Sequence, residues 1–153
     1  MRYYEDFTEG RVWDYDARYE LTEAELLEVG RRWDPQPFHT DPVAAEASMF
    51  GGLVASSVHL FAIATSLGAS VPADQRTAAV SALGFRMLKL HAPARPGDVL
   101  RMRTTVLERR LSNSRPGVGV VTNRSELRNQ SNDLVYDHEG AFLVHCRPPD
   151  PDG

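Results

Sequence analysis

The sequence predicts an α+β domain in which a curved antiparallel sheet wraps around a central apolar helix. From residue 79 onward, apolar and polar residues alternate with the period of a β-strand in four runs: 79–91, 98–111, 117–129 and 134–147. Turn-forming Pro, Gly, Asn and Asp residues separate these runs. The preceding segment 53–67 is rich in Ala, Leu and Ile, so it is expected to form a buried helix capped by Ser56 or Ser57. Strands that follow a helical segment are typical of an α+β domain whose helix covers one face of the sheet.

The amino-terminal part predicts one more strand and one more long helix. Residues 11–19 alternate between apolar and polar types and indicate a strand. Thr22 begins the sequence Thr-Glu-Ala-Glu, which has the spacing of a capping box with Glu25. Apolar residues at helical spacing follow, so a helix is expected over 23–33.

Two prolines then end that helix. Pro35 disfavours the helical conformation of the residue before it, and Pro37 restricts a second backbone angle, so the chain is expected to run extended through Phe38. Asp41 followed by Pro resembles a helix N-cap and opens a short helix that reaches about residue 48. The pair Gly51-Gly52 is expected to form a flexible turn, since it lacks the lysine of a phosphate-binding loop.

Length and composition favour a single domain of ordinary globular character. The chain has 153 residues, of which 42% are hydrophobic and 25% charged. One domain is expected over residues 1–147, followed by a flexible tail rich in Pro and Asp over 148–153. The net charge of −4 leaves no basic excess for a phosphate backbone, so nucleic-acid binding is not expected.

Cysteine content and apolar patterning indicate a cytoplasmic protein without a membrane span. Cys146 is the single cysteine, which excludes an internal disulfide, and it is interpreted as a core residue. The first residues contain no apolar stretch of signal-peptide length. The longest apolar stretch, 53–69, is interrupted by Ser, Thr, His and Gly, so it is not expected to cross a bilayer.

Asp34 and His39 are the strongest candidates for chemistry. They lie five residues apart with two prolines between them, so a stiff turn holds both side chains with little conformational freedom left to lose. Asp34 follows the end of the predicted helix, where the helix dipole disfavours an anion by about 0.3–1 kcal/mol. Spacing alone also allows a structural interpretation, in which Asp34 caps a local turn and His39 packs or caps beside Asp41.

Other histidine arrangements carry weaker signals. His145 and Cys146 are neighbours in a predicted strand and point to opposite faces, so they cannot act together. His39, Asp41 and His59 do not have the spacing of a recognised metal site, and neither a metal nor another cofactor is expected. His91 and His138 are interpreted as solvent-facing or capping residues.

Two motifs resemble those of the MaoC-like dehydratases, also called R-specific enoyl-CoA hydratases. Trp-Asp-Pro-Gln-Pro-Phe-His-Thr-Asp over 33–41 contains the paired Asp34 and His39, and Phe50 follows eleven residues after the histidine. The turn Pro-Ala-Arg-Pro-Gly-Asp over 93–98 also resembles the family pattern. The resemblance covers about residues 7–147 and implies the hotdog fold, a curved antiparallel sheet around a central helix.

The resemblance implies a hydro-lyase that reversibly hydrates a trans-2-enoyl-CoA to an R-3-hydroxyacyl-CoA. Asp34 and His39 would handle the water, and the backbone N–H of Ser57 would bind the thioester oxygen. The family has glycine at the position of Ser57, so a hydroxymethyl group here stands where the thioester should lie. Further substrate-binding positions are implied at Gly52, Ser56, Thr65 and Phe50. A buried threonine bonded to the preceding helical turn is an equally good interpretation of Thr65.

The expected partners are an acyl-CoA substrate and a second copy of the chain. Family members of this kind form homodimers or higher homo-oligomers, so a monomer is not expected. Two alternatives remain open at this stage: a non-catalytic hotdog subunit that binds acyl thioesters or a partner subunit, and an acyl-CoA thioesterase. The sequence does not define the acyl chain length, the thioester carrier or the physiological direction of the reaction.

Overall fold

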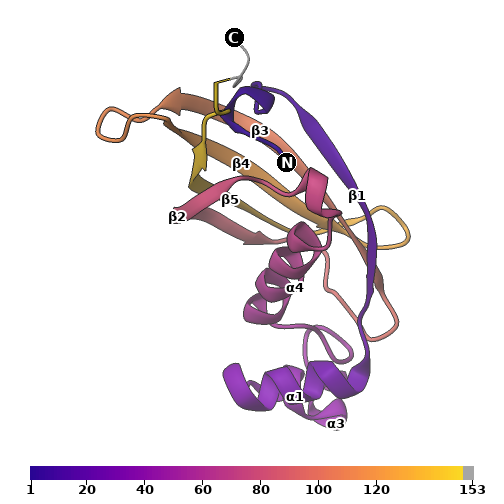
Figure 1. The fold of residues 1–153 in the computed structure, drawn as a ribbon. Coiled ribbons are helices and arrows are strands. Elements are labelled where there is room, and N and C mark those ends of the chain that lie inside the picture. Colours follow the sequence, from indigo (N-terminus) through magenta and orange to yellow (C-terminus); the bar gives the residue numbers. More distant parts are fainter. Residues whose placement is uncertain (150–153) are drawn as a thin grey trace.

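The computed structural model, which describes residues 1–149, contains a five-stranded antiparallel sheet that curves around one long helix (Figure 1). The strands occur in the order β1-β3-β4-β5-β2, and their bounds are Val12–Glu20 (β1), Ala79–Leu90 (β2), Val99–Leu111 (β3), Val118–Arg128 (β4) and Leu134–His145 (β5). The helices are α1 (Glu23–Trp33), α2 (Pro37–Thr40), α3 (Pro42–Glu46) and α4 (Ser57–Ala69), with 3-10 turns at Tyr4–Asp6 and Ala73–Gln75.

Helix α4 packs on the concave face of the sheet, as the sequence predicts (Figure 1). Its buried side chains recur at helical spacing and meet inward-facing residues of β3, β4 and β5 in one core. Burial of each Leu or Ile contributes about 1.5–3 kcal/mol relative to exposure. Helices α1, α2 and α3 lie together beyond the N-terminal end of α4 and carry the segment that contains Asp34 and His39.

The predicted strands are confirmed to within two residues at each end, and the helix expected over 23–33 coincides with α1. Thr22 Oγ1 accepts the N–H of Glu25 at 3.3 Å, so the predicted N-cap is present. The reciprocal half of the capping box does not form. The Glu25 carboxylate instead accepts a hydrogen bond from the hydroxyl of Tyr19.

Two predicted boundaries were wrong. The chain does not run extended through Phe38 but forms α2 from Pro37, because the fixed backbone angle of proline suits the first position of a helix. Residues 53–55 are not helical, since the N–H groups of Val54 and Ala55 bond to Phe38 O at 3.2 Å and Ala94 O at 2.9 Å. The main helix therefore begins at Ser57, and its N-cap is Ser56, which confirms the predicted cap.

The carboxyl-terminal end of the described chain corrects one further expectation. Cys146 is not a core residue but a partly buried free cysteine just beyond β5. The predicted flexible tail over 148–153 lies mostly outside the described residues. Within residues 1–149, none of the helices is both long enough and apolar enough to span a membrane.

Strand β2 forms one edge of the sheet and is exposed along almost its whole length. Its exposed apolar side chains are Val80, Leu83, Phe85, Leu88 and Leu90. An edge strand presents unpaired backbone hydrogen-bonding groups and can pair with another strand. A long apolar edge of this kind is typical of an interface.

Candidate active site

The structure brings Asp34 and His39 together at the end of α1. His39 Nε2 lies 3.5 Å from Asp34 Oδ2. The His39 side chain is 8% exposed and that of Asp34 is 29% exposed, so the pair faces solvent through the carboxylate. Asp34 is the C-cap of α1, and its N–H bonds to Gly30 O at 3.0 Å. The carboxylate thus stands at the helix end that disfavours an anion.

The other ring nitrogen of His39 determines which tautomer is present. His39 Nδ1 lies 2.6 Å from the carbonyl oxygen of Val54. A carbonyl oxygen can only accept, so Nδ1 carries the proton and donates this hydrogen bond. In the neutral ring, Nε2 is then left with a free lone pair directed toward Asp34. This arrangement suits a group that accepts a proton.

Gly30 allows α1 to approach the backbone of His39 closely. A Cβ atom at position 30 would lie 3.0 Å from His39 Cβ and from its carbonyl carbon, and closer still to the carbonyl oxygen. Only glycine leaves room for this approach. This role of Gly30 was not predicted from the sequence. A glycine on the buried face of a helix was the available signal.

The loop before α4 is braced by Arg95, which sequence reasoning also missed. Arg95 Nη2 donates to Phe50 O at 2.5 Å, and the Arg95 N–H donates to Asp98 Oδ2 at 2.8 Å. Gly52 adopts φ of +152°, and a Cβ there would lie 3.1 Å from Arg95 Nη1. The turn around residues 95–98 therefore supports the loop that holds Val54 against His39.

The N-terminus of α4 follows directly after this loop. Ser56 is buried, and its hydroxyl oxygen accepts the N–H of His59 at 3.3 Å as the N-cap. Ser57 is the first helical residue and is partly exposed. The first N–H groups of a helix have no partner within the helix, so the N–H of Ser57 is available to an acceptor. Positive dipole character at this end favours an oxygen that carries negative charge.

The remaining predicted positions fall in different surroundings. The ring of Phe50 packs on that of Phe38 at 5.0 Å, and Phe38 in turn contacts the His39 ring at 4.5 Å. Phe50 and Gly52 therefore lie in the loop before α4, which packs against α2 beside the dyad. Thr65 is exposed, and its hydroxyl donates to Phe61 O at 3.0 Å. This is the hydrogen bond to the preceding helical turn that the structural interpretation of Thr65 predicted. The burial that this interpretation also predicted is not found.

A second group of polar side chains lies in a hollow of about 500 Å³ between α1 and α4. His59 is 2% exposed, and its Nε2 lies 3.5 Å from Glu25 Oε1. Burial lowers the pKa of His59, although Glu25 acts in the opposite direction. Burial and the bond to Glu25 raise the pKa of Tyr19 to about 12. No three His, Cys, Asp or Glu side chains within residues 1–149 gather closely enough to hold a metal.

His138 is not the solvent-facing residue that the sequence indicated. It is 8% exposed and lies on the inner face of β5, with its Nδ1 2.9 Å from the hydroxyl of Tyr136. Its ring contacts Phe61 of α4 at 5.3 Å. Burial lowers its pKa, while nearby Asp137 acts in the opposite direction. His91 is exposed, as expected, and its Nε2 pairs with Asp137 Oδ1 at 2.8 Å.

A curved antiparallel sheet around α4, with an Asp–His pair beside the helix N-terminus, defines a hotdog-fold protein. The sequence pattern of the family described as MaoC like domain matches residues 6–129. The chain therefore belongs to the MaoC-like dehydratase family, as its motifs predicted. Comparison with curated proteins finds no match.

Solved structures agree with this assignment. A MaoC-like dehydratase from Rhodospirillum rubrum is 36% identical with a TM-score of 0.86, and the alignment covers 97% of this chain and 99% of that one. An unliganded R-hydratase from Pseudomonas aeruginosa is 21% identical with a TM-score of 0.70, over 99% and 96% of the two chains. A Mycobacterium tuberculosis protein described as a double hotdog fold is 22% identical with a TM-score of 0.75, over 99% and 46%. The last two support the fold.

Proposed function

We propose that the protein is a hydro-lyase that reversibly adds water to a trans-2-enoyl-CoA and yields an R-3-hydroxyacyl-CoA. The geometry of Asp34 and His39 carries this proposal. Asp34 Oδ2 and His39 Nε2 are both acceptors and lie 3.5 Å apart. A water molecule that donates one O–H to each would be held and oriented by the pair. Membership of the MaoC-like family supports this general chemistry.

In the hydration direction, His39 acts as the general base. Its Nε2 takes a proton from the water as the water oxygen bonds to C3 of the substrate. The electron pair of the double bond moves toward C2 and the thioester oxygen. C2 then takes a proton from the same side, from the dyad, so that one water is consumed and no other reagent is needed. The bond from Nδ1 to Val54 O stabilises the imidazolium that forms between the two steps.

The thioester oxygen needs a hydrogen-bond donor because it carries the developing negative charge. The N–H of Ser57 at the start of α4 is our candidate for this donor. Phe50, Gly52 and Ser56 support it by building the loop and the cap that precede it. The exposed position of Thr65 allows a contact with the acyl chain or with the CoA arm.

We further propose a homodimer that joins through the edge strand β2. This strand has twelve residues and carries the exposed apolar side chains of Val80, Leu83, Phe85, Leu88 and Leu90. Pairing with a second copy would satisfy its free backbone groups and cover this row. The active form of the enzyme is then the dimer.

Turnover of a series of enoyl-CoA thioesters tests the activity through loss of absorbance by the conjugated double bond. Asp34→Asn and His39→Ala should each lower kcat by about 10²-fold or more, the scale of one lost acid–base group. His145→Ala, which removes an exposed histidine at the end of β5, is the matched control and should keep wild-type turnover. Wild-type rates in both dyad variants would contradict the mechanism.

A thiol-release assay on the same substrates distinguishes the alternatives. Release of free CoA without hydration would identify a thioesterase. Binding of the thioester without either reaction would favour a non-catalytic subunit.

A further inference from the structure

Three arginines stand in a row across the convex face of the sheet. Arg18 of β1 is paired in register with Arg101 of β3, and Arg101 is paired with Arg128 of β4. The neighbours of Arg101 along β3, Leu100 and Met102, are buried against the core, so Arg101 points to the opposite face from α4. Like charges directly opposite each other destabilise a sheet. A row of three therefore calls for a functional explanation.

In the next row of paired residues on this face of the sheet, the arginine lies opposite a carboxylate on each side. Arg103 donates two hydrogen bonds to Asp14, at 2.7 and 3.0 Å, and is paired in register with Glu126. Opposite charges alternate along that row. In the arginine row, Arg128 forms an ion pair with Glu126 at 2.9 Å. Among residues 1–149, Arg18 and Arg101 have no carboxylate within ion-pair distance. Within residues 1–149 the guanidinium groups of Arg18 and Arg101 thus form no direct ion pair, although the carboxylates of Asp14 and Asp16 lie nearby on β1, in a chain whose net charge is −4.

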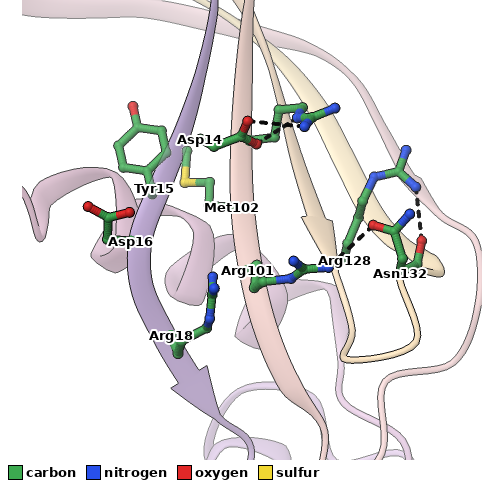
Figure 2. Close-up of a pocket in the computed structure, with 9 residues that line it drawn as sticks. Asp14, Tyr15, Asp16, Arg18, Arg101, Met102, Arg128 and Asn132 are labelled. Atoms are coloured by element: carbon green, nitrogen blue, oxygen red, sulfur yellow. Dashed lines mark hydrogen bonds and ion pairs between the residues drawn. The ribbon is translucent and has the colours of Figure 1, made fainter.

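A bulge in β1 opens a hollow beside this row. The register passes from Asp14 opposite Arg103 to Arg18 opposite Arg101, so the intervening residues of β1 bow away from β3. The resulting hollow of about 230 Å³ is lined by residues of β1, β3 and β4 and by Asn132. Among its lining residues, the four arginines Arg18, Arg101, Arg103 and Arg128 outnumber the two carboxylates Asp14 and Asp16. Figure 2 shows the Arg18 side chain in the gap between β1 and β3, with Arg101 and Arg128 directed toward Asn132.

The turn between β4 and β5 holds two of the arginines in place. Asn132 has φ of +67°, a conformation that asparagine tolerates better than most residues. Its side-chain oxygen accepts from Arg101 Nη2 at 3.3 Å, and its carbonyl oxygen accepts from Arg128 Nη1 at 3.1 Å. Asn129 Oδ1 fixes the turn by accepting two backbone N–H groups, at 2.9 and 3.0 Å. The guanidinium groups are thus pre-organised before any ligand binds.

We propose that this hollow, the arginine-row site, binds a phosphate group. Guanidinium groups donate in a planar fork that matches phosphate oxygens, and the charge of a phosphate can compensate both free arginines where a carboxylate supplies one charge. The hollow is smaller than the roughly 300–1,000 Å³ typical of sites for whole drug-sized molecules. It therefore fits free phosphate or the phosphate of a larger ester whose remainder stays outside. None of its lining residues belongs to the Asp34–His39 site.

Isothermal titration calorimetry in phosphate-free buffer of low ionic strength tests the site. The probes are inorganic phosphate, adenosine 3′,5′-bisphosphate as a small phosphate ester, and acetate as a singly charged control. Saturable binding is expected for at least one phosphate probe, weakening as salt is added. Tighter binding of the bisphosphate would identify an ester as the source, and tighter binding of inorganic phosphate would identify the free ion.

Substitutions then assign the binding to the row. Arg101→Ala should weaken phosphate binding by about 10-fold or more, the scale of a charge-assisted hydrogen bond, and Arg101→Lys should give an intermediate value. Arg110→Ala is the matched control, because Arg110 is an exposed arginine of the same strand outside the hollow. Thermal unfolding without ligand checks that each variant folds, and Arg18→Ala provides a second test should Arg101→Ala fail to fold. Absence of saturable phosphate binding, equal binding in Arg101→Ala or Arg18→Ala, or an equal loss in Arg110→Ala would overturn the proposal.

Discussion

Replacing Gly30 by alanine should damage the proposed active site through one methyl group on the buried face of α1. The new Cβ would lie 3.0 Å from both the Cβ atom and the carbonyl carbon of His39, and closer still to its carbonyl oxygen. Ordinary contacts begin near 3.4 Å. The backbone of His39 cannot rotate away as a flexible side chain would. We therefore expect α1 and α2 to separate by about 1 Å, a displacement that can cost about 10²-fold in rate.

The free energy of unfolding of Gly30→Ala shows whether the strain at His39 outweighs the higher helix propensity of alanine. Alanine in a helix interior gains roughly 0.8–1 kcal/mol over glycine, whereas overpacking costs about 1–3 kcal/mol. We expect a net loss of up to about 2 kcal/mol in the free energy of unfolding, measured in urea. Gly68→Ala in α4 is the matched control, because its Cβ would meet the flexible end of Met102 at 3.5 Å, an ordinary contact.

Steady-state kinetics on an enoyl-CoA complete the test. Because the strain displaces His39 and not the proposed thioester donor at Ser57, kcat should fall while KM changes little. Gly68→Ala should keep wild-type kcat and equal or greater stability. Wild-type kcat in Gly30→Ala together with a gain in stability like that of Gly68→Ala would refute the reasoning.

Two further predictions concern pH and assembly. Burial lowers the pKa of both His59 and His138 below the ordinary value of 6.5, so the unfolded chain binds more protons than the folded chain below that pH. The free energy of unfolding should therefore fall as pH drops from about 7.5 to 5.5, by at most about 1.4 kcal/mol per pH unit for each histidine, and urea titrations of wild type and His59→Gln would show it. A pH-independent stability over this range would contradict this account. Leu83→Lys on the edge strand should convert the proposed dimer to a monomer in light scattering, whereas Leu111→Lys, at an exposed apolar residue at the end of β3, should not. An unchanged dimer in Leu83→Lys would exclude pairing through β2.

The sequence by itself determined the order and type of the main elements. Period-two runs, the Thr22 cap and the Pro and Gly turns are local signals, so their consequences could be predicted without distant contacts. The same holds for the stiff turn that carries Asp34 and His39. Where local signals conflicted, prediction failed: Pro37 can end an extended segment or begin a helix, and contacts with α1 and with Val54 decided for the helix.

Only the tertiary structure decided how that pair is oriented. The tautomer of His39 depends on Val54, fifteen residues away, and its position depends on Gly30 and on a loop braced by Arg95. The arginine row likewise arises from register between three strands that are distant in the sequence. Such contacts do not produce a periodic pattern in the sequence, because a hydrogen bond or a close approach depends on where folding brings two segments. Asp34 and His39 were therefore visible as a pair from their spacing, and the geometry that would make them work came from the folded chain.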